Sequence, residues 1–231
     1  MSLRDKSDIS WVATYFPHVP LYPYATWEAK PATPYHSKSK GAEALTYLNF
    51  VIQHYGCRLP KMAAFIHGHR RSWHVEDAAN QLLWLRWDQQ EFWNLRCRGH
   101  PGCSGGVFPK KDPKNKGEFG TPYGNMWSKV LEKHGLGPVP DWVASPCCAE
   151  LLVPKEAIMR WPIELYMDLR QWLLDTDYSD YTTSRVFEYT WHVLWGNNGT
   201  VNCPDEVMCK CQLYGECKGQ HREQRQTRLL L

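Results

Sequence analysis

The stretch SKGAEALTYLNFVIQHYGCRLPKMAAFIHGH, residues 39–69, contains the two elements that decide the fold of this chain. Apolar side chains recur at helical spacing over 45–52, which predicts a helix that stops before Pro60. The next run, MAAFIHGH (62–69), is apolar and has no helical period, so it predicts a buried central strand. The polar end of this strand is then the natural place for a functional site.

Further strands and helices are predicted on both sides of this stretch. ISWVATYF (9–16) is β-branched and aromatic and predicts a first strand, so the order is strand, helix, strand. That order favours an α/β fold with a mixed, mostly parallel central sheet flanked by helices. Further helices are expected over 76–90, 125–134, 162–175 and 183–195, further strands in FWNLRC (92–97) and CCAELLV (147–153), and a long loop over 98–125.

The length of 231 residues suits a single domain over 1–231, large enough to bury about 70% of the surface of the unfolded chain. Within it we expect an α/β core (8–202), a Cys-rich disulfide segment (203–217) and a polar tail (218–231). A net charge of +3 with scattered basic residues argues against nucleic acid as a partner. No apolar run is long enough for a membrane span.

The nine cysteines favour an oxidising compartment. The closing run CPDEVMCKCQLYGEC (203–217) has gaps of five, one and five residues, which suit disulfides better than the paired spacing of zinc sites. Cys97 and Cys103 are expected to pair and close a small loop. Because the number of cysteines is odd, at least one thiol is expected to be free or to pair with another chain. Cys147 and Cys148 fit a disulfide or core role better than catalysis. We expect a secretory or extracellular protein whose signal or anchor is not in this sequence.

The segment FIHGHRRSWH follows the predicted central strand. His67 and His69 alternate, so both could face one way and ligate a metal through neutral imidazoles. Arg70 could bind phosphate or carboxylate, with Trp73 and His74 also in contact with substrate. The alternative is that these histidines have ordinary structural roles and that the arginine lies on the surface.

Glu188 and His192 are spaced i, i+4 and would share one helix face, as a general base with its partner or as two metal ligands. A surface salt bridge involving Arg185 is the competing interpretation. Two more side chains are predicted to bind substrate: Lys40, before a helix N-terminus, and Arg96.

Several segments together resemble the fungal proteins grouped as domain of unknown function 3431, collinearly over about residues 8–217. They are KGAEALTYLNFVIQHYGCRLPKMAAFIHGHRRSWH, NLRCRGHPGC, PCCAELLVPKEAIMRWPIELYMDLRQWLLDT, SRVFEYTWHVLWG and the Cys-rich tail. We therefore expect the chain to be a member.

At the level of fold, the pattern is also similar to the GT-A fold of nucleotide-sugar glycosyltransferases. That resemblance places His67-Gly68-His69 where those enzymes hold a divalent metal with Asp-x-Asp, makes Glu188 the acceptor base, and makes His192 a late metal ligand. Imidazole ligands favour zinc or another transition metal over magnesium. The function expected is a glycosyltransferase-like enzyme using a nucleotide sugar. The alternatives are a His-metal enzyme of another class, hydrolytic or oxidative, and a non-catalytic carbohydrate-binding domain.

Overall fold

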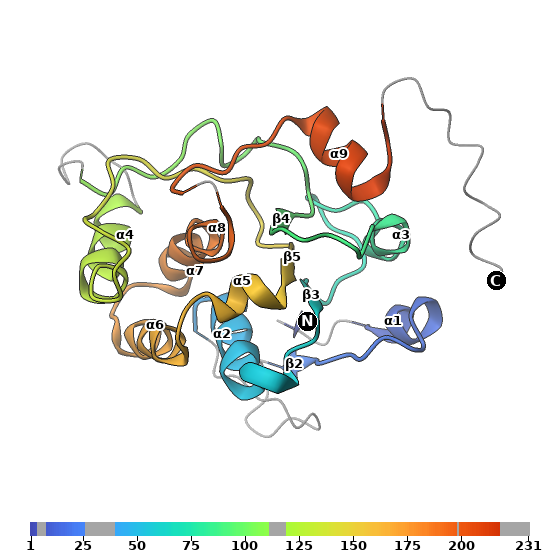
Figure 1. Ribbon diagram of the computed structural model, residues 1–231, viewed down its shortest axis with the longest axis horizontal. Helices are drawn as coiled ribbons and strands as arrows, with labels where there is room; N and C mark the ends of the chain where they lie inside the picture. The colour runs from blue at the N-terminus through green and yellow to red at the C-terminus, as the bar shows by residue number, and fades with distance from the viewer. Residues whose placement is uncertain (4–7, 26–39, 111–118, 198, 218–231) are drawn as a thin grey trace.

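The computed structural model describes residues 1–3, 8–25, 40–110, 119–197 and 199–217, and the predicted polar tail lies outside these ranges. Figure 1 shows most helices gathered on one side of a small sheet, with α1, α3 and α9 on the other side. The helices are α1 (Ser10–Tyr15), α2 (Glu43–His54), α3 (Ala78–Trp84), α4 (Gly120–Met126), α5 (Lys155–Met159), α6 (Ile163–Asp175), α7 (Asp180–Glu188), α8 (Trp191–Trp195) and α9 (Glu206–Tyr214), with a 3₁₀ turn η1 (Gly56–Arg58) and a π-helical turn η2 (Trp127–Leu131). The class is mixed α/β, as expected.

The central sheet has the strand order β3 (Met62–Phe65), β5 (Leu151–Pro154), β4 (Trp93–Asn94), and both pairings are antiparallel. Among the described residues, parallel pairing is confined to β1 (Ser2–Leu3) with β2 (Tyr24–Ala25) and to two isolated bridges, Ser2 with His67 and Ala144 with Val201. The prediction of a mostly parallel sheet is therefore wrong for the described strands. Strand β5 is the central strand and pairs antiparallel with β3 on one side and β4 on the other, so the prediction that 62–69 contains the central strand is wrong. The sequence pattern did not reveal the direction of β4 and β5.

Strand β5 separates two hydrophobic cores because successive side chains on a strand point to opposite faces. Leu151 and Val153 belong to the larger core with α2 and the helices α4 to α8, whereas Leu152 belongs to the smaller core with α1, α3 and α9. All four residues of β5 are buried. The prediction of a strand here is confirmed.

One strand prediction and several helix bounds need correction. Residues 9–16 were expected to be a strand but contain helix α1, which begins where Asp8 accepts a hydrogen bond from the Ser10 N–H and which packs Trp11 and Val12 into the smaller core. Short β-branched runs do not distinguish strand from buried helix. Helix α3 is shorter than 76–90, and α4 begins at Gly120, inside the expected long loop.

The predicted helix 183–195 is divided. Helix α7 ends at Glu188 and α8 begins at Trp191, because Thr190 donates its N–H to Phe187 (2.8 Å) and its hydroxyl to Val186 (2.7 Å). The side chain thus competes for a backbone carbonyl and bends the chain. Glu188 and His192 therefore do not share a continuous helix face. The helices predicted over 45–52 and 162–175 are confirmed as α2 and α6.

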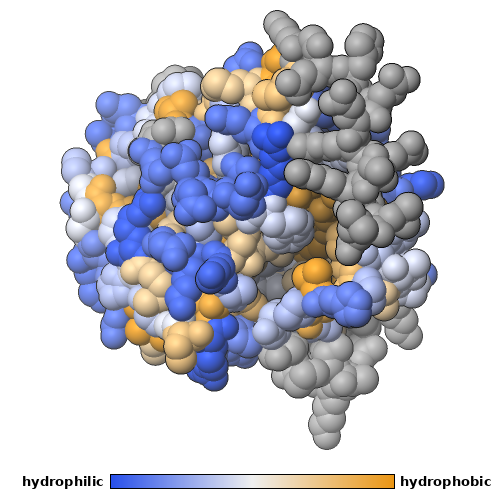
Figure 2. All heavy atoms as spheres, turned by 45° about the vertical axis from the view of Figure 1, so that its right-hand side comes forward, coloured by the Kyte–Doolittle hydropathy of each residue, from blue (hydrophilic) through white to orange (hydrophobic). Residues whose placement is uncertain are grey.

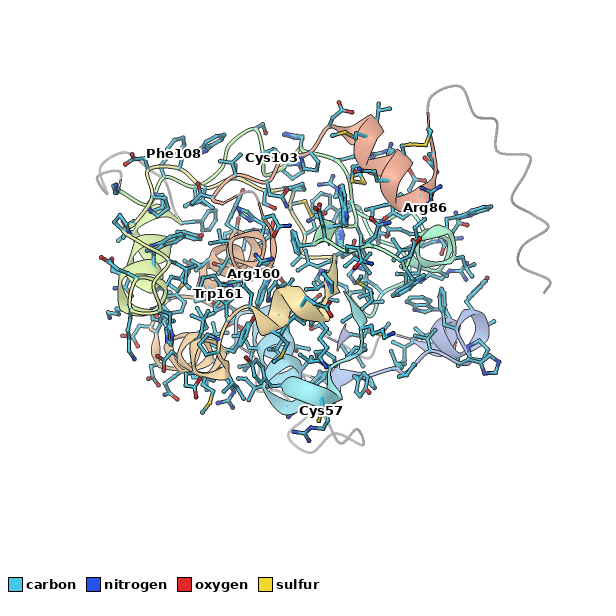
Figure 3. The ribbon with its side chains drawn as sticks, in the orientation of Figure 1. Cys57, Arg86, Cys103, Phe108, Arg160 and Trp161 are labelled. Atoms are coloured by element: carbon cyan, nitrogen blue, oxygen red, sulfur yellow. A yellow bond between two sulfur atoms is a disulfide. The ribbon has the colours of Figure 1, made fainter. Side chains whose placement is uncertain are left out.

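Four disulfides connect Cys97–Cys209, Cys103–Cys203, Cys147–Cys148 and Cys211–Cys217. Cys97 and Cys103 thus do not pair with each other: each ties a loop to the C-terminal segment that contains α9. Cys57 is a free, exposed thiol just after α2, whereas Cys103 lies near the top of the view in Figure 3. These bonds are compatible with an oxidising secretory or extracellular environment. No helix within the described ranges is both long and apolar enough to cross a membrane.

Candidate metal centre

The chain beyond β3 is fixed on both sides. Ser2 donates its N–H to Ile66 (2.9 Å) and accepts from the Gly68 N–H (2.8 Å), while the Trp11 indole donates to the Gly68 carbonyl (3.2 Å). These bonds extend the strand pairing as far as His67. The prediction of a polar segment at the end of a strand is confirmed.

Three imidazole rings form a cluster at this strand end. The ring centroids of His67 and His69 are 5.2 Å apart and the rings stack, with an interplanar angle of 9°. His74 lies 5.4 Å from His67 and 5.3 Å from His69. The loop returns His74 to the strand end because Ser72 donates its N–H to the Val75 carbonyl (2.9 Å). All three rings are partly exposed, so a solvated ion could reach them.

Glu150, just before β5, lies beside the histidines. A ring nitrogen of His67, a ring nitrogen of His74 and a carboxylate oxygen of Glu150 all lie within 4.8 Å of one another. Ligand atoms around tetrahedral zinc are separated by about 3.3 Å, given metal–nitrogen distances of about 2.05 Å. Small side-chain rotations would therefore bring the three atoms into one coordination sphere.

The environment of Glu150 favours a cation. The side chain is only 3% exposed, and Oε2 has no hydrogen-bond partner in the described part of the chain. Burial raises the pKa of Glu150 to about 8, Arg96 opposes this shift, and Glu43 adds to it. A buried carboxylate without a partner is costly, and coordination of a metal removes that cost.

Hydrogen bonds orient the rings of His67 and His74. His67 Nε2 lies 2.9 Å from the Cys148 carbonyl oxygen, so Nε2 carries the proton and Nδ1 carries the lone pair that a metal needs. The Ser72 hydroxyl lies 3.1 Å from His74 Nδ1 and orients that ring. Burial, followed by the nearby His67, His69 and arginines, lowers the pKa of His74 to about 4. The imidazole is therefore neutral at pH 7, the form that binds metals.

Glu188 is brought to the same place by Cys148. It is buried, forms an ion pair with Arg185, and accepts a hydrogen bond from the Cys148 N–H. Burial raises the pKa of Glu188, although Arg185 and the Cys148 N–H oppose the shift. Cys148 and Ala149 have φ values of 85° and 46°, which only a well-supported turn can hold. This turn directs the Cys148 N–H to Glu188 and its carbonyl to His67.

The remaining predicted residues have other partners. His192 is buried and its Nε2 lies 3.0 Å from the Thr200 carbonyl oxygen, on a segment apart from the histidine cluster. Lys40 donates to the carbonyls of Thr176 (3.0 Å) and Tyr178 (2.9 Å), so it closes the end of α6. Neither contact supports the metal or anion role predicted for these two residues.

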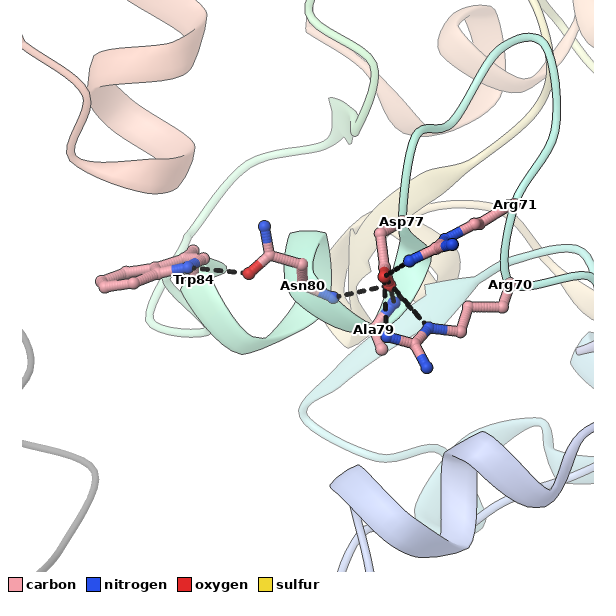
Figure 4. A network of polar contacts seen from close by, with 6 residues as sticks. All are labelled: Arg70, Arg71, Asp77, Ala79, Asn80 and Trp84. Carbon is pink, nitrogen blue, oxygen red and sulfur yellow. Dashed lines mark hydrogen bonds and ion pairs between the residues drawn. The ribbon is translucent and has the colours of Figure 1, made fainter.

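Arg70 is also occupied. Asp77 accepts from Arg70 Nη2 at 2.7 Å and from Nε at 2.9 Å, and it also caps α3 through the N–H groups of Ala79 and Asn80 (Figure 4). The side-chain hydrogen bond to Arg70 lowers the pKa of Asp77 far below its usual value. Arg70 thus holds the histidine loop against α3.

The exposed Trp73 lies beside the histidines, and the half-buried Arg96 packs against it. The Arg96 guanidinium carbon lies 5.4 Å from the Trp73 ring centroid, and Trp73 packs edge-on against His74, with ring centroids 5.1 Å apart. Trp73 is 72% exposed, which is rare for so large an aromatic side chain. The substrate-binding role predicted for both side chains stays a prediction.

Two features of the site were missed from the sequence: Glu150 and the buried Glu43. A disulfide role for Cys147 and Cys148 was expected, but not that they pair with each other. Glu150 had one available signal, since it is the single charge in the apolar run CCAELLV. Glu43 lies in the first turn of α2 and is buried. Its charge raises the pKa of both Glu150 and Glu188, which shows that three buried carboxylates share one region.

Neither of two cavities in the described part of the chain includes the three histidines or Glu150 in its lining. One of about 170 Å³ is lined by side chains from α1, α2 and β3, including Trp11, Tyr47 and Phe65. Figure 2, which turns the α1 side forward, shows hydrophobic side chains gathered around a hollow. The histidine cluster therefore adjoins an apolar cavity, because Phe65 and Ile66, just before His67, line that cavity.

Comparison with known proteins now supplies a family. The family described as "Protein of unknown function (DUF3431)" matches residues 1–212. The chain belongs to this family. The match spans every element of the DUF3431 chain that contributes to the histidine cluster, from β1 to β5 and α7. No curated protein and no solved structure matches the chain.

Proposed function

We propose that this DUF3431 protein is a metal-dependent enzyme whose ion, zinc in the first instance, is held by His67, His74 and Glu150. The observation that carries the proposal is the convergence of their three ligand atoms within 4.8 Å, with Glu150 Oε2 buried and without a partner among the described residues. Two imidazoles and one carboxylate are the ligands of several catalytic zinc sites and of non-haem iron(II) oxygenases. His69 stacks on His67 and fixes its ring.

The residues around the proposed zinc ion suit a hydrolysis or group-transfer reaction. A zinc ion with three protein ligands supplies an activated water or polarises a bound oxygen. Glu188, whose pKa is raised by burial, is linked to His67 through Cys148 and would accept or donate a proton. Arg96 is a half-buried cation beside the exposed Trp73, which fits a substrate with an anionic group.

A sugar-nucleotide transferase is the second candidate, and one observation favours it. The exposed ring of Trp73 beside the Arg96 guanidinium could stack on a base or sugar while the arginine contacts phosphate. The contacts of Lys40 and Arg70 with Tyr178 and Asp77 remove two of the predicted phosphate ligands. Secretion is part of the same proposal and is supported by the four disulfides.

Thermal unfolding with a panel of metals and ligands tests these alternatives. We expect Zn²⁺ alone to raise the melting temperature, Mg²⁺ to have little effect, and Glu150→Gln to abolish the response to Zn²⁺. A further rise with a nucleoside diphosphate only in the presence of metal would support the transferase. Stabilisation by glycans alone, with no response to any transition metal, would overturn the proposal in favour of a carbohydrate-binding domain.

A further inference from the structure

The bond between Cys147 and Cys148 lies next to Glu188, and neither sulfur has a role in the proposed centre. The two Sγ atoms and a carboxylate oxygen of Glu188 all lie within 4.8 Å of one another, and all three residues are buried. We infer that reduction of this bond creates a second metal site, formed by two thiolates and the Glu188 carboxylate. Thiolates select soft or borderline ions, so the ligand is a cation such as Zn²⁺ or Cd²⁺.

The disulfide between Cys147 and Cys148 joins neighbouring residues, with a sequence separation of 1, whereas two of the other disulfides span 112 and 100 residues. A disulfide stabilises a protein mainly by restricting the unfolded chain, and it does so more for long loops than for short ones. Opening the bond between Cys147 and Cys148 therefore leaves the fold intact as long as the two long-range bonds remain.

The backbone around the sulfurs is held independently of the bond. The Asn94 side chain donates to the carbonyls of Pro146 (3.2 Å) and Cys147 (3.1 Å), and the Tyr47 hydroxyl donates to the Ala149 carbonyl (3.1 Å). The Cys147 N–H donates to the Pro101 carbonyl (3.1 Å). The two thiols thus stay beside Glu188 after reduction.

A positive charge lies beside the sulfur atoms. Arg96 Nη1 is 2.6 Å from Cys147 Sγ and 4.0 Å from Cys148 Sγ. A guanidinium next to sulfur favours thiolate, which is the form that binds metal. Glu188 keeps a carboxylate oxygen for the ion while the other pairs with Arg185, because a carboxylate has about four acceptor positions.

Reduction of the disulfide between Cys147 and Cys148 needs a dithiol reductant. One thiolate of the reductant attacks a sulfur of the pair, and the resulting mixed disulfide is resolved by its second thiol. The reductant leaves as a cyclic disulfide, two electrons having passed to the protein, and Cys147 and Cys148 are left as thiols. Binding of the cation then releases their two protons to solvent.

The test is uptake of Cd²⁺ by the full chain after treatment with dithiothreitol. Because other disulfides can also be reduced, the result is the difference between the native chain and Cys147→Ser/Cys148→Ser under identical conditions. We expect the native chain to take up one more equivalent of Cd²⁺, and Glu188→Gln to weaken that equivalent by about tenfold. Equal uptake by the two chains would overturn the inference.

A second measurement needs no variant of the cysteines. Cd²⁺ should protect Cys147 and Cys148 of the reduced native chain from alkylation by iodoacetamide, as mapped by peptide mass spectrometry. Equal alkylation with and without Cd²⁺ would contradict the inference. The double variant Glu150→Gln/His74→Gln, which lacks the proposed first centre, should keep this protection, so failure of one site is distinguishable from failure of the other.

Discussion

His67 and Glu188, 121 positions apart in the sequence, bind opposite sides of one residue: the Cys148 carbonyl oxygen lies 2.9 Å from His67 Nε2, and the Cys148 N–H donates to Glu188. A proposed metal ligand and a proposed proton-transfer group are therefore fixed to each other through a single turn. The same turn presents Glu150 to His67 and His74.

The pH dependence of stability tests the burial of Glu150. The pKa of Glu150 is raised from 4.5 to about 8. The stability that its protonated carboxyl contributes is therefore fully present below about pH 4.5 and is lost as the pH rises through 8. We expect the difference in unfolding free energy between Glu150→Gln and the metal-free native chain to grow in favour of the variant from pH 5 to pH 8, as measured by urea unfolding with a chelator. A difference that is independent of pH would show that Glu150 ionises normally.

Asp77 joins the histidine loop to α3, and its replacement should affect both. Asp77→Ala removes the cap of α3 and the partner of Arg70, so it should cost about 1–2 kcal/mol of stability. Asp77→Asn keeps a capping oxygen and should recover most of the loss. Chemical unfolding of the two variants checks this, and equal losses would assign the effect to the ion pair rather than to the cap.

The disulfides should differ in their contribution to stability. Cys97→Ser/Cys209→Ser removes a bond that spans 112 residues and should cost about 2–5 kcal/mol. Cys147→Ser/Cys148→Ser removes a bond between neighbours and should cost far less. Calorimetry under non-reducing conditions measures both. A larger loss for the neighbouring pair would contradict the account of which bonds hold the fold.

Local sequence patterns predicted the long elements and the place of the site. Helices α2 and α6 have clear apolar periods, and the run predicted as a strand at 62–69 contains β3, although β3 is an edge strand in which only Phe65 is buried. The gaps between cysteines correctly favoured disulfides over zinc in the C-terminal segment. These features depend on neighbours in the sequence.

Features that depend on distant parts of the chain could not be predicted. The direction of β4 and β5 follows from pairing across the fold, and the division between α7 and α8 follows from the hydroxyl of Thr190. Glu150 becomes a ligand candidate only because antiparallel pairing of β5 brings its start next to the end of β3. No spacing rule joins positions 67, 74 and 150.

Zinc binding to the oxidised protein tests the central claim most directly. With free Zn²⁺ at 100 times its dissociation constant, binding should add about 2.7 kcal/mol to the unfolding free energy. His74→Gln and Glu150→Gln should lose this gain, whereas His18→Gln, at an exposed position on the surface, should keep it. X-ray absorption of the zinc-loaded protein should show two imidazoles and one carboxylate oxygen as the protein ligands. A first shell without imidazole, or zinc binding unchanged by Glu150→Gln, would contradict the account.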